Sequence, residues 1–126
     1  MSKRLLVLLR GRTKREQLFR MGRRWREPTG RVQVIAMEGD ESQVLHYVVV
    51  VSRAVCPKAV GRNRIRRLLR ESLRIIAQQH PELLAPYRTL ALRWLSTAHG
   101  SEWKRLPLLE VLSAVTSALQ QPLAQP

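Results

Sequence analysis

The stretch Pro57–Ser72, "PKAVGRNRIRRLLRES", joins an apolar stripe with six cationic side chains. Apolar residues return at intervals of three or four, which is the spacing of one face of an α-helix. The stripe continues beyond the stretch and consists of Ile65, Leu68, Leu69, Leu73 and Ile76. We therefore predict a helix over residues 58–79, ending before His80 and Pro81.

The cations of this helix are unusually crowded. Arg62, Arg66, Arg70 and Arg74 repeat every four residues, and only Glu71 among them is acidic. Like charges at this spacing repel each other by a few tenths of a kcal/mol per pair. Guanidinium groups bind phosphate oxygens in a bidentate manner. The pattern favours a surface for a polyanion over an ordinary solvated face.

The composition supports the same interpretation. The chain has 126 residues, enough for one domain, with 23 Lys and Arg against 9 Asp and Glu and a net charge of +14. Eleven of the cations lie in residues 1–31 and eight in residues 52–74. Nucleic acid is the commonest partner of such a chain, and an anionic membrane surface comes second.

Several classes of protein are disfavoured. A single cysteine, Cys56, rules out an internal disulfide and a zinc knuckle and suits a reducing compartment. No apolar run approaches the roughly 18 residues of a membrane span. We expect a cytoplasmic protein with no membrane partner.

The remaining segments predict a small α/β arrangement. Residues 13–22 read as a helix with Thr13 and Glu16 as a capping box and Gly22 as its stop. Residues 31–37 and 44–52 read as strands joined by a hairpin-like connection over 38–42, and residues 87–95 as a third strand.

A last helix should follow Pro107. Its inward residues would be Leu108, Leu109, Leu112, Val115 and Leu119. The order α-β-β-α-β-α predicts an α+β two-layer sandwich with helices on one sheet face. We expect one domain, residues 1–126, with residues 1–11 and 120–126 loosely ordered.

The segment Val51–Ser72, "VSRAVCPKAVGRNRIRRLLRES", resembles the signature of the bacterial ribonuclease P protein subunit. The matching parts are Ser-Arg at the strand end, Lys-Ala-Val, Arg-Asn-Arg, a basic pair, Leu-Leu and Arg-Glu. The resemblance implies a small mixed sheet with a left-handed β-α-β crossover, similar to the second domain of a ribosomal protein. Pattern alone would favour a right-handed crossover.

The resemblance also implies a function. The family removes the 5′ leader of precursor tRNA with a large catalytic RNA and Mg²⁺ ions bound mainly by that RNA, and the protein is an assisting subunit. The protein would pair one-to-one with the ribonuclease P RNA. The residues implied to contact it are Arg53, Lys58, Arg62, Asn63, Arg64, Arg66, Arg67 and Arg70.

Four further residues are candidates for holding the leader. Phe19 matches an aromatic of the family three residues before a glycine, and an aromatic can stack on a base. Arg15 stands where the family commonly has a second aromatic. Arg31 and Gln33 should project from the sheet away from the helix layer.

We predict no catalytic residue and no metal ligand in the chain. A protein nuclease needs clustered carboxylates or an acid–base pair, and the nine acids here are scattered. The protein alone should therefore be inactive. Two alternatives remain open at this point, a ribosome-associated structural RNA-binding protein and a membrane-surface protein.

Overall fold

The structure is a computed structural model that describes residues 5–39, 44–97 and 101–124. In these residues the chain forms five strands, three α-helices and two short 3-10 helices. They are β1 (Leu5–Leu8), α1 (Arg12–Met21), β2 (Arg23–Arg26), β3 (Val32–Glu38), β4 (Val44–Val51), α2 (Ala59–Gln79), η1 (Pro81–Leu83), β5 (Tyr87–Trp94), η2 (Glu102–Arg105) and α3 (Leu108–Ala124).

The strands form one mixed sheet in the order β1-β4-β5-β3-β2. β4 is parallel to both of its neighbours, β1 and β5, whereas β3 is antiparallel to β5 and β2. α2 connects β4 to the adjacent parallel strand β5. The α+β class and the mixed sheet are confirmed, and the left-handed sense of the crossover stays a prediction.

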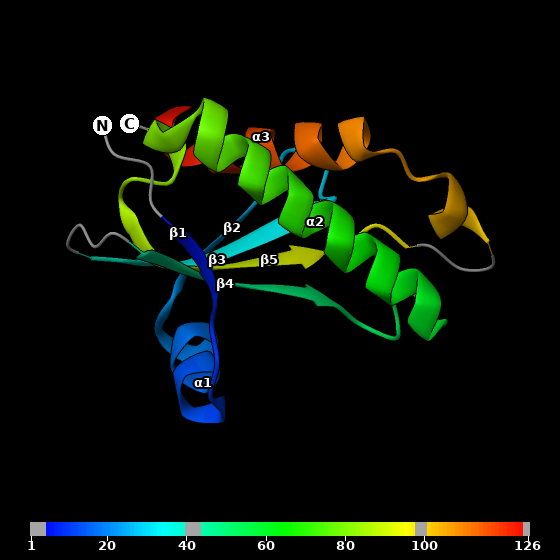
Figure 1. Ribbon diagram of the computed structural model, residues 1–126, viewed down its shortest axis with the longest axis horizontal. Helices are drawn as coiled ribbons and strands as arrows, with labels where there is room; N and C mark the ends of the chain where they lie inside the picture. The colour runs from blue at the N-terminus through cyan, green and yellow to red at the C-terminus, as the bar shows by residue number, and fades with distance from the viewer. Residues whose placement is uncertain (1–4, 40–43, 98–100, 125–126) are drawn as a thin grey trace.

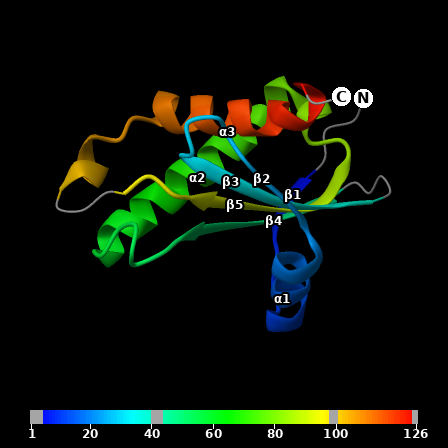
Figure 2. The ribbon, with the colours of Figure 1, turned by 180° about the vertical axis from the view of Figure 1, so that it is seen from behind.

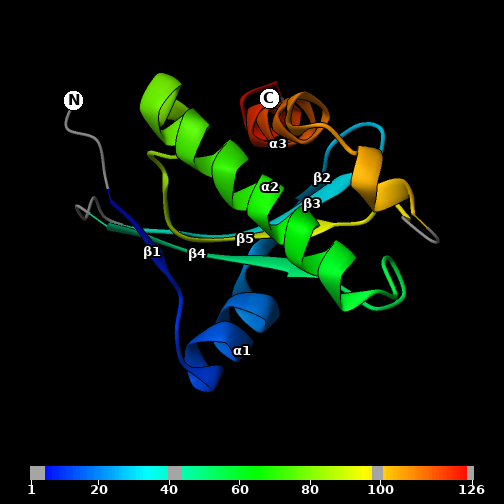
Figure 3. The same ribbon diagram turned by 45° about the vertical axis from the view of Figure 1, so that its right-hand side comes forward.

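The helices lie on both faces of the sheet. α2 and α3 cover one face, and α1 lies on the other (Figures 1 and 2). Figure 3 shows the same separation after a 45° turn. The prediction that helices cover one face only is therefore incomplete, because α1 buries Leu18 against Ile35, Val48 and Ala91 of the sheet.

The main core lies between the sheet and the pair α2 and α3. The predicted stripe of α2 is confirmed, since Ile65, Leu69, Leu73 and Ile76 are at most 1% exposed. Full burial of each such side chain contributes roughly 1.5–3 kcal/mol. Leu68 is half-buried at the edge of this core. Among the described residues, no helix has the length and apolarity to cross a bilayer.

Alternation along β3 sorts its side chains as predicted. Val32, Val34 and Ala36 enter the main core, while Ile35 joins the small core beneath α1. On the neighbouring strands, Val48 and Ala91 also belong to the small core. We call the face of the sheet that bears these side chains the α1 face. It is formed by β3, β5 and β4.

The two edge strands were not predicted. Residues 1–11 were expected to be loose, but Leu5–Leu8 pair in parallel with Val44–Tyr47. β2, with the sequence "RRWR", pairs with β3 although it lacks an apolar alternation. Edge strands gain their order from backbone pairing with a neighbour, which a side-chain pattern does not reveal.

The expected looseness of residues 120–126 is also wrong for the part that is described. α3 continues to Ala124 and includes Pro122. Residues 1–4 and 125–126 lie outside the described residues.

The predicted hairpin-like connection over 38–42 is wrong. β3 and β4 do not pair, because β5 lies between them in the sheet. The prediction failed because strands adjacent in sequence were assumed to be adjacent in space. Residues 40–43 lie outside the described residues.

α1 begins one residue earlier than predicted and without a capping box. Its N-cap is Gly11, whose φ of 100° favours glycine, and no side chain caps the helix. Thr13 lies inside the helix. The stop at Gly22 is confirmed, since its N–H donates to the Leu18 carbonyl over 2.8 Å.

The prediction of which residues form the inward face of α3 is partly wrong. Leu109 is 76% exposed, whereas Val111, Ala114 and Ala118 are fully buried with Val115 and Leu119. The prediction favoured large residues. The small ones are inward because they allow α3 to approach its neighbours closely.

Candidate nucleic-acid interface

The cationic side chains of α2 have few acidic neighbours on the helix. Its first turn contains no acid, and the one acid of its middle, Glu71, forms an ion pair with Arg74. Hydrogen bonding with Arg74 lowers the pKa of Glu71. The more N-terminal arginines of α2 therefore keep an uncompensated positive charge among the described ion pairs.

Arg62 is held at the entrance of α2. Its Nη1 donates to the carbonyls of Cys56 and Pro57 over 3.0 and 2.7 Å. Cys56 itself is buried at this bend. A guanidinium has five N–H donors in a rigid fork, so engagement of one nitrogen leaves donors for a phosphate.

Arg64 has a different role. Its Nε donates to the Trp103 carbonyl over 3.0 Å and its Nη2 to the Leu106 carbonyl over 2.9 Å. These bonds tie the η2 segment to α2. Two of the three guanidinium nitrogens of Arg64 thus already donate to backbone carbonyls. This side chain therefore has fewer donors left for the predicted RNA contact.

The other predicted cations lie at the surface. Arg53, Lys58, Arg67 and Arg70 are exposed, as is Asn63. The half-buried Arg66 donates a hydrogen bond to the Asn63 side-chain oxygen. The structure therefore brings together an exposed basic surface on α2 and its approach, which we define as Arg53, Lys58, Asn63, Arg66, Arg67 and Arg70.

A second group of candidates meets on the α1 face. Phe19 is half-buried against the small core, and the Arg93 guanidinium carbon lies 5.4 Å from the centroid of its ring. Gln33 pairs in register with Arg93, and its Oε1 is 3.5 Å from Arg93 Nη1. Phe19 and Gln33, two predicted leader contacts, thus both lie against Arg93, and their role in leader binding stays a prediction.

Arg15 lies on the same flank of α1 as Phe19. It lines a hollow of about 390 Å³ with Gly11, Arg12, Glu16 and Phe19. Its Nε donates to the Leu9 carbonyl over 3.3 Å. An arginine held beside an aromatic can contact a phosphate or stack on a base.

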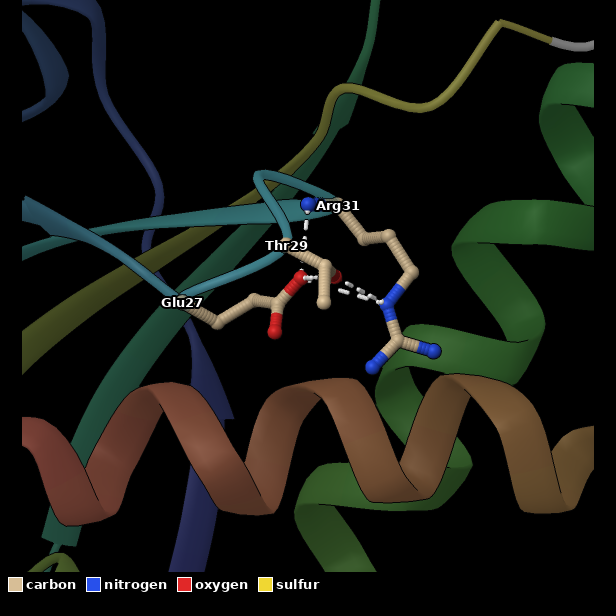
Figure 4. Close-up of polar contacts among 3 residues, drawn as sticks. All are labelled: Glu27, Thr29 and Arg31. Carbon is tan, nitrogen blue, oxygen red and sulfur yellow. Dashed lines mark hydrogen bonds and ion pairs between the residues drawn. The ribbon is translucent and has the colours of Figure 1, made fainter.

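Arg31 does not join this group. It precedes β3, and its side chain bonds to Glu27 and Thr29 at the β2–β3 turn (Figure 4). The prediction extended the alternation of β3 one residue too far, because Arg31 lies in the turn.

Glu27 was not anticipated and is the partner of Arg31. The side chain is 1% exposed, and its Oε1 accepts from the Thr29 hydroxyl, the Arg31 N–H at 2.8 Å and the Arg31 Nε at 3.2 Å. Burial opposes ionisation, but these hydrogen bonds outweigh it and lower the pKa of Glu27 from 4.5 to about 2. A buried acid in the turn "EPTG" leaves no periodic signal in the sequence.

The tryptophans serve packing. Trp94 and Trp103 are at most 8% exposed, and the half-buried Trp25 donates from Nε1 to the Ala118 carbonyl over 2.6 Å. Trp25 also packs against Tyr87 with their ring centroids 5.8 Å apart. Among the described residues, no three His, Cys, Asp or Glu side chains gather in a metal-binding group.

The chain matches one protein family and several solved structures. A family described as Ribonuclease P matches residues 6–107. No curated protein matches the chain. Among solved structures, the chain is similar to the RNase P protein of Staphylococcus aureus, with 15% identity, a TM-score of 0.67 and coverage of 91% of this chain and 94% of that one. It is also similar to the RNase P protein of Thermotoga maritima, with 18% identity, a TM-score of 0.66 and coverage of 90% and 94%.

Proposed function

The chain belongs to the ribonuclease P protein family, and from this premise we propose that it is the protein subunit of a ribonuclease P holoenzyme. It binds the catalytic RNA through the exposed basic surface of α2. It holds the 5′ leader of precursor tRNA against the α1 face of its sheet. The RNA subunit, with Mg²⁺ that it mainly binds, hydrolyses the phosphodiester and leaves a 5′-phosphate on the tRNA.

One observation carries this proposal. α2, which bears the exposed cations, lies on one face of the sheet (Figure 1), and Phe19, Gln33 and Arg93 meet on the other face, where α1 lies. A single face would serve one RNA. Two faces of different chemistry, one purely cationic and one aromatic and cationic, suit a protein that contacts a folded RNA and a single strand together.

The α2 surface screens the negative charge of RNA phosphates. Each arginine or lysine that neutralises a phosphate releases a condensed counterion, which favours binding at moderate salt. Positive charge beside the catalytic RNA also reduces the repulsion between that RNA and its anionic substrate. The protein side chains thereby raise substrate affinity without taking part in bond cleavage.

The α1 face supplies a grip on a single strand. The half-buried Phe19 is the aromatic platform of this face, and a base stacked on such a ring contributes roughly 1–3 kcal/mol. Arg93 lies over the ring and can contact an adjoining phosphate. Neither interaction reads a particular base, which suits leaders of varied sequence.

Reconstitution tests the proposal. The purified protein is added to a bacterial ribonuclease P RNA at low Mg²⁺, and precursor tRNA cleavage is followed with the RNA alone and the protein alone as controls. We expect cleavage only when both are present. Cleavage by the protein alone, or no gain over the RNA alone, would overturn it. Co-sedimentation with ribosomal subunits instead of the ribonuclease P RNA would favour a ribosome-associated role.

A further inference from the structure

The α1 face contains a second hollow that the proposed function does not use. It has a volume of about 460 Å³, and its walls include Lys14 and Gln17 of α1 and Arg88 of β5. On a helix with 100° per residue, the mean direction of Lys14 and Gln17 lies about 150° from that of Arg15 and Phe19. The two hollows therefore flank α1 on opposite sides, with Leu18 closing the sheet between them.

The floor of this second hollow is a row across three strands. Thr89 pairs in register with Met37 on one side and with His46 on the other. These three side chains line the hollow, as does the apolar Leu9. The floor thus offers an apolar patch beside hydrogen-bonding groups, which is the mixture that a base and its sugar require.

An irregularity of the sheet turns Arg88 toward the same hollow. Met37 pairs with Thr89 but Glu38 pairs with Tyr87, so the register passes over Arg88. Tyr87 and Leu90 enter the main core, whereas Arg88 and Thr89, adjacent in sequence, both line the hollow. β-Bulges re-aim side chains in this way and are enriched next to functional sites.

The charged side chains among the described residues that line the hollow are both cations. Lys14 and Arg88 come from different elements and are both exposed. The nearest acid in sequence to the register shift, Glu38, lies 3.6 Å from Arg23 in an ion pair. Two cations over a partly apolar floor suit a nucleotide better than a neutral or purely apolar ligand.

We propose that this hollow, bounded by Lys14 and Arg88, seats a nucleotide of the leader upstream of the one held at Phe19. Its phosphate lies between the two cations and its base lies over Met37 and His46. The inference rests on the proposed function, since it assigns a further part of the same substrate.

The spacing of the two seats sets their order on the leader. Arg93 pairs with Val50, two residues before the loop that leads into α2, so the Phe19 seat lies nearer the catalytic RNA. Thr89 is four residues from Arg93, which is about 13 Å along a strand. A stacked strand advances about 3.4 Å per nucleotide, and the leader has to pass around α1 between the two hollows, so the second seat receives a base at least about four nucleotides farther upstream.

The test compares precursor tRNAs with leaders of about three and about ten nucleotides in the reconstituted holoenzyme. The variants are Lys14→Gln and Arg88→Gln, with Lys104→Gln and Arg105→Gln, two exposed cations of η2, as matched controls. We expect the first two to weaken binding of the long-leader precursor roughly three- to tenfold, and to leave the short-leader precursor unchanged. The salt dependence for the long leader should fall by about 0.7 log units per lost phosphate contact.

The outcomes are separable. If wild-type protein supports cleavage but Lys14→Gln and Arg88→Gln bind the long-leader precursor like the controls, this inference is overturned and the proposed function stands. If both precursors lose affinity equally, the hollow is not an upstream seat and the inference also fails. If wild-type protein gives no gain over the RNA alone, the proposed function itself fails. Thermal melting of each variant confirms that it is folded.

Discussion

At the scale of single residues, two arginines of the same signature have opposite surroundings. Arg67 is exposed, whereas Arg64 donates to carbonyls 39 and 42 residues later in the chain. The sequence identifies both as members of a basic helix. It does not separate them, because the acceptors of Arg64 belong to a distant loop and are backbone atoms.

This contrast predicts that substitution of Arg64 mainly lowers stability, whereas substitution of Arg67 mainly weakens RNA binding. Arg64→Ala removes the hydrogen bonds from this side chain to the carbonyls of Trp103 and Leu106 and should reduce the free energy of unfolding by about 1–3 kcal/mol. Arg67→Ala should change that free energy by less than about 0.5 kcal/mol. It should instead weaken catalytic-RNA binding and lower its salt slope by about 0.9. Urea unfolding and salt-dependent binding measure the two quantities, and equal losses of stability would contradict the assignment.

Glu27 gives a prediction about pH. Its pKa is about 2 in the folded protein and close to the ordinary value of 4.5 when unfolded, so its carboxylate stabilises the fold above pH 5. That contribution, on the order of 2–3 kcal/mol, is lost as the pH falls from about 4.5 toward 2. In Glu27→Gln this loss should be absent, so the two proteins should converge in stability near pH 2. Denaturation curves from pH 2 to 7 would contradict this if their difference stayed constant.

At the scale of elements, side-chain periodicity predicted the buried stripes of α2 and β3 and missed the mostly exposed edge strands. The stripe of α2 and the alternation of β3 were found because burial selects apolar residues at the period of each element. β1 and β2 escaped because edge strands are held by backbone bonds to one neighbour. Phe19 and Gln33 were predicted as leader contacts from the sequence, whereas the proximity of Arg93 to them depends on the register between β3 and β5.

The junction of α1 with the sheet is the element-scale feature most open to test. A Cβ added at Gly22 would lie 2.6 Å from the Leu18 carbonyl oxygen and 2.8 Å from Ile35 Cγ2. Gly22→Ala must therefore shift the end of α1 away from the sheet, at a cost of roughly 1–3 kcal/mol. We expect a lower melting temperature and weaker binding of precursor tRNA, with catalytic-RNA affinity retained. Loss of catalytic-RNA affinity to the same degree would show that the two surfaces are not independent.

At the scale of the whole molecule, the sheet separates the two proposed binding surfaces. α2 and α3 share a large core on one side, and α1 has a small core of its own on the other (Figure 2). Side chains on the two sides share no hydrogen bond or ion pair among those described. Charge can therefore be altered on one surface with little effect on the other.

This separation predicts additivity in the holoenzyme. Phe19→Ala should weaken precursor tRNA binding by roughly 1–3 kcal/mol and leave mature tRNA binding nearly unchanged, because only the precursor has a leader. Arg67→Ala should weaken assembly with the catalytic RNA. Since the sites lie on opposite faces, Phe19→Ala should weaken precursor binding by the same amount, within about 0.5 kcal/mol, in the wild-type and the Arg67→Ala background once catalytic RNA is saturating. A coupling energy above 1 kcal/mol, from a double-mutant cycle on precursor binding at saturating catalytic RNA, would mean that one RNA contacts both faces.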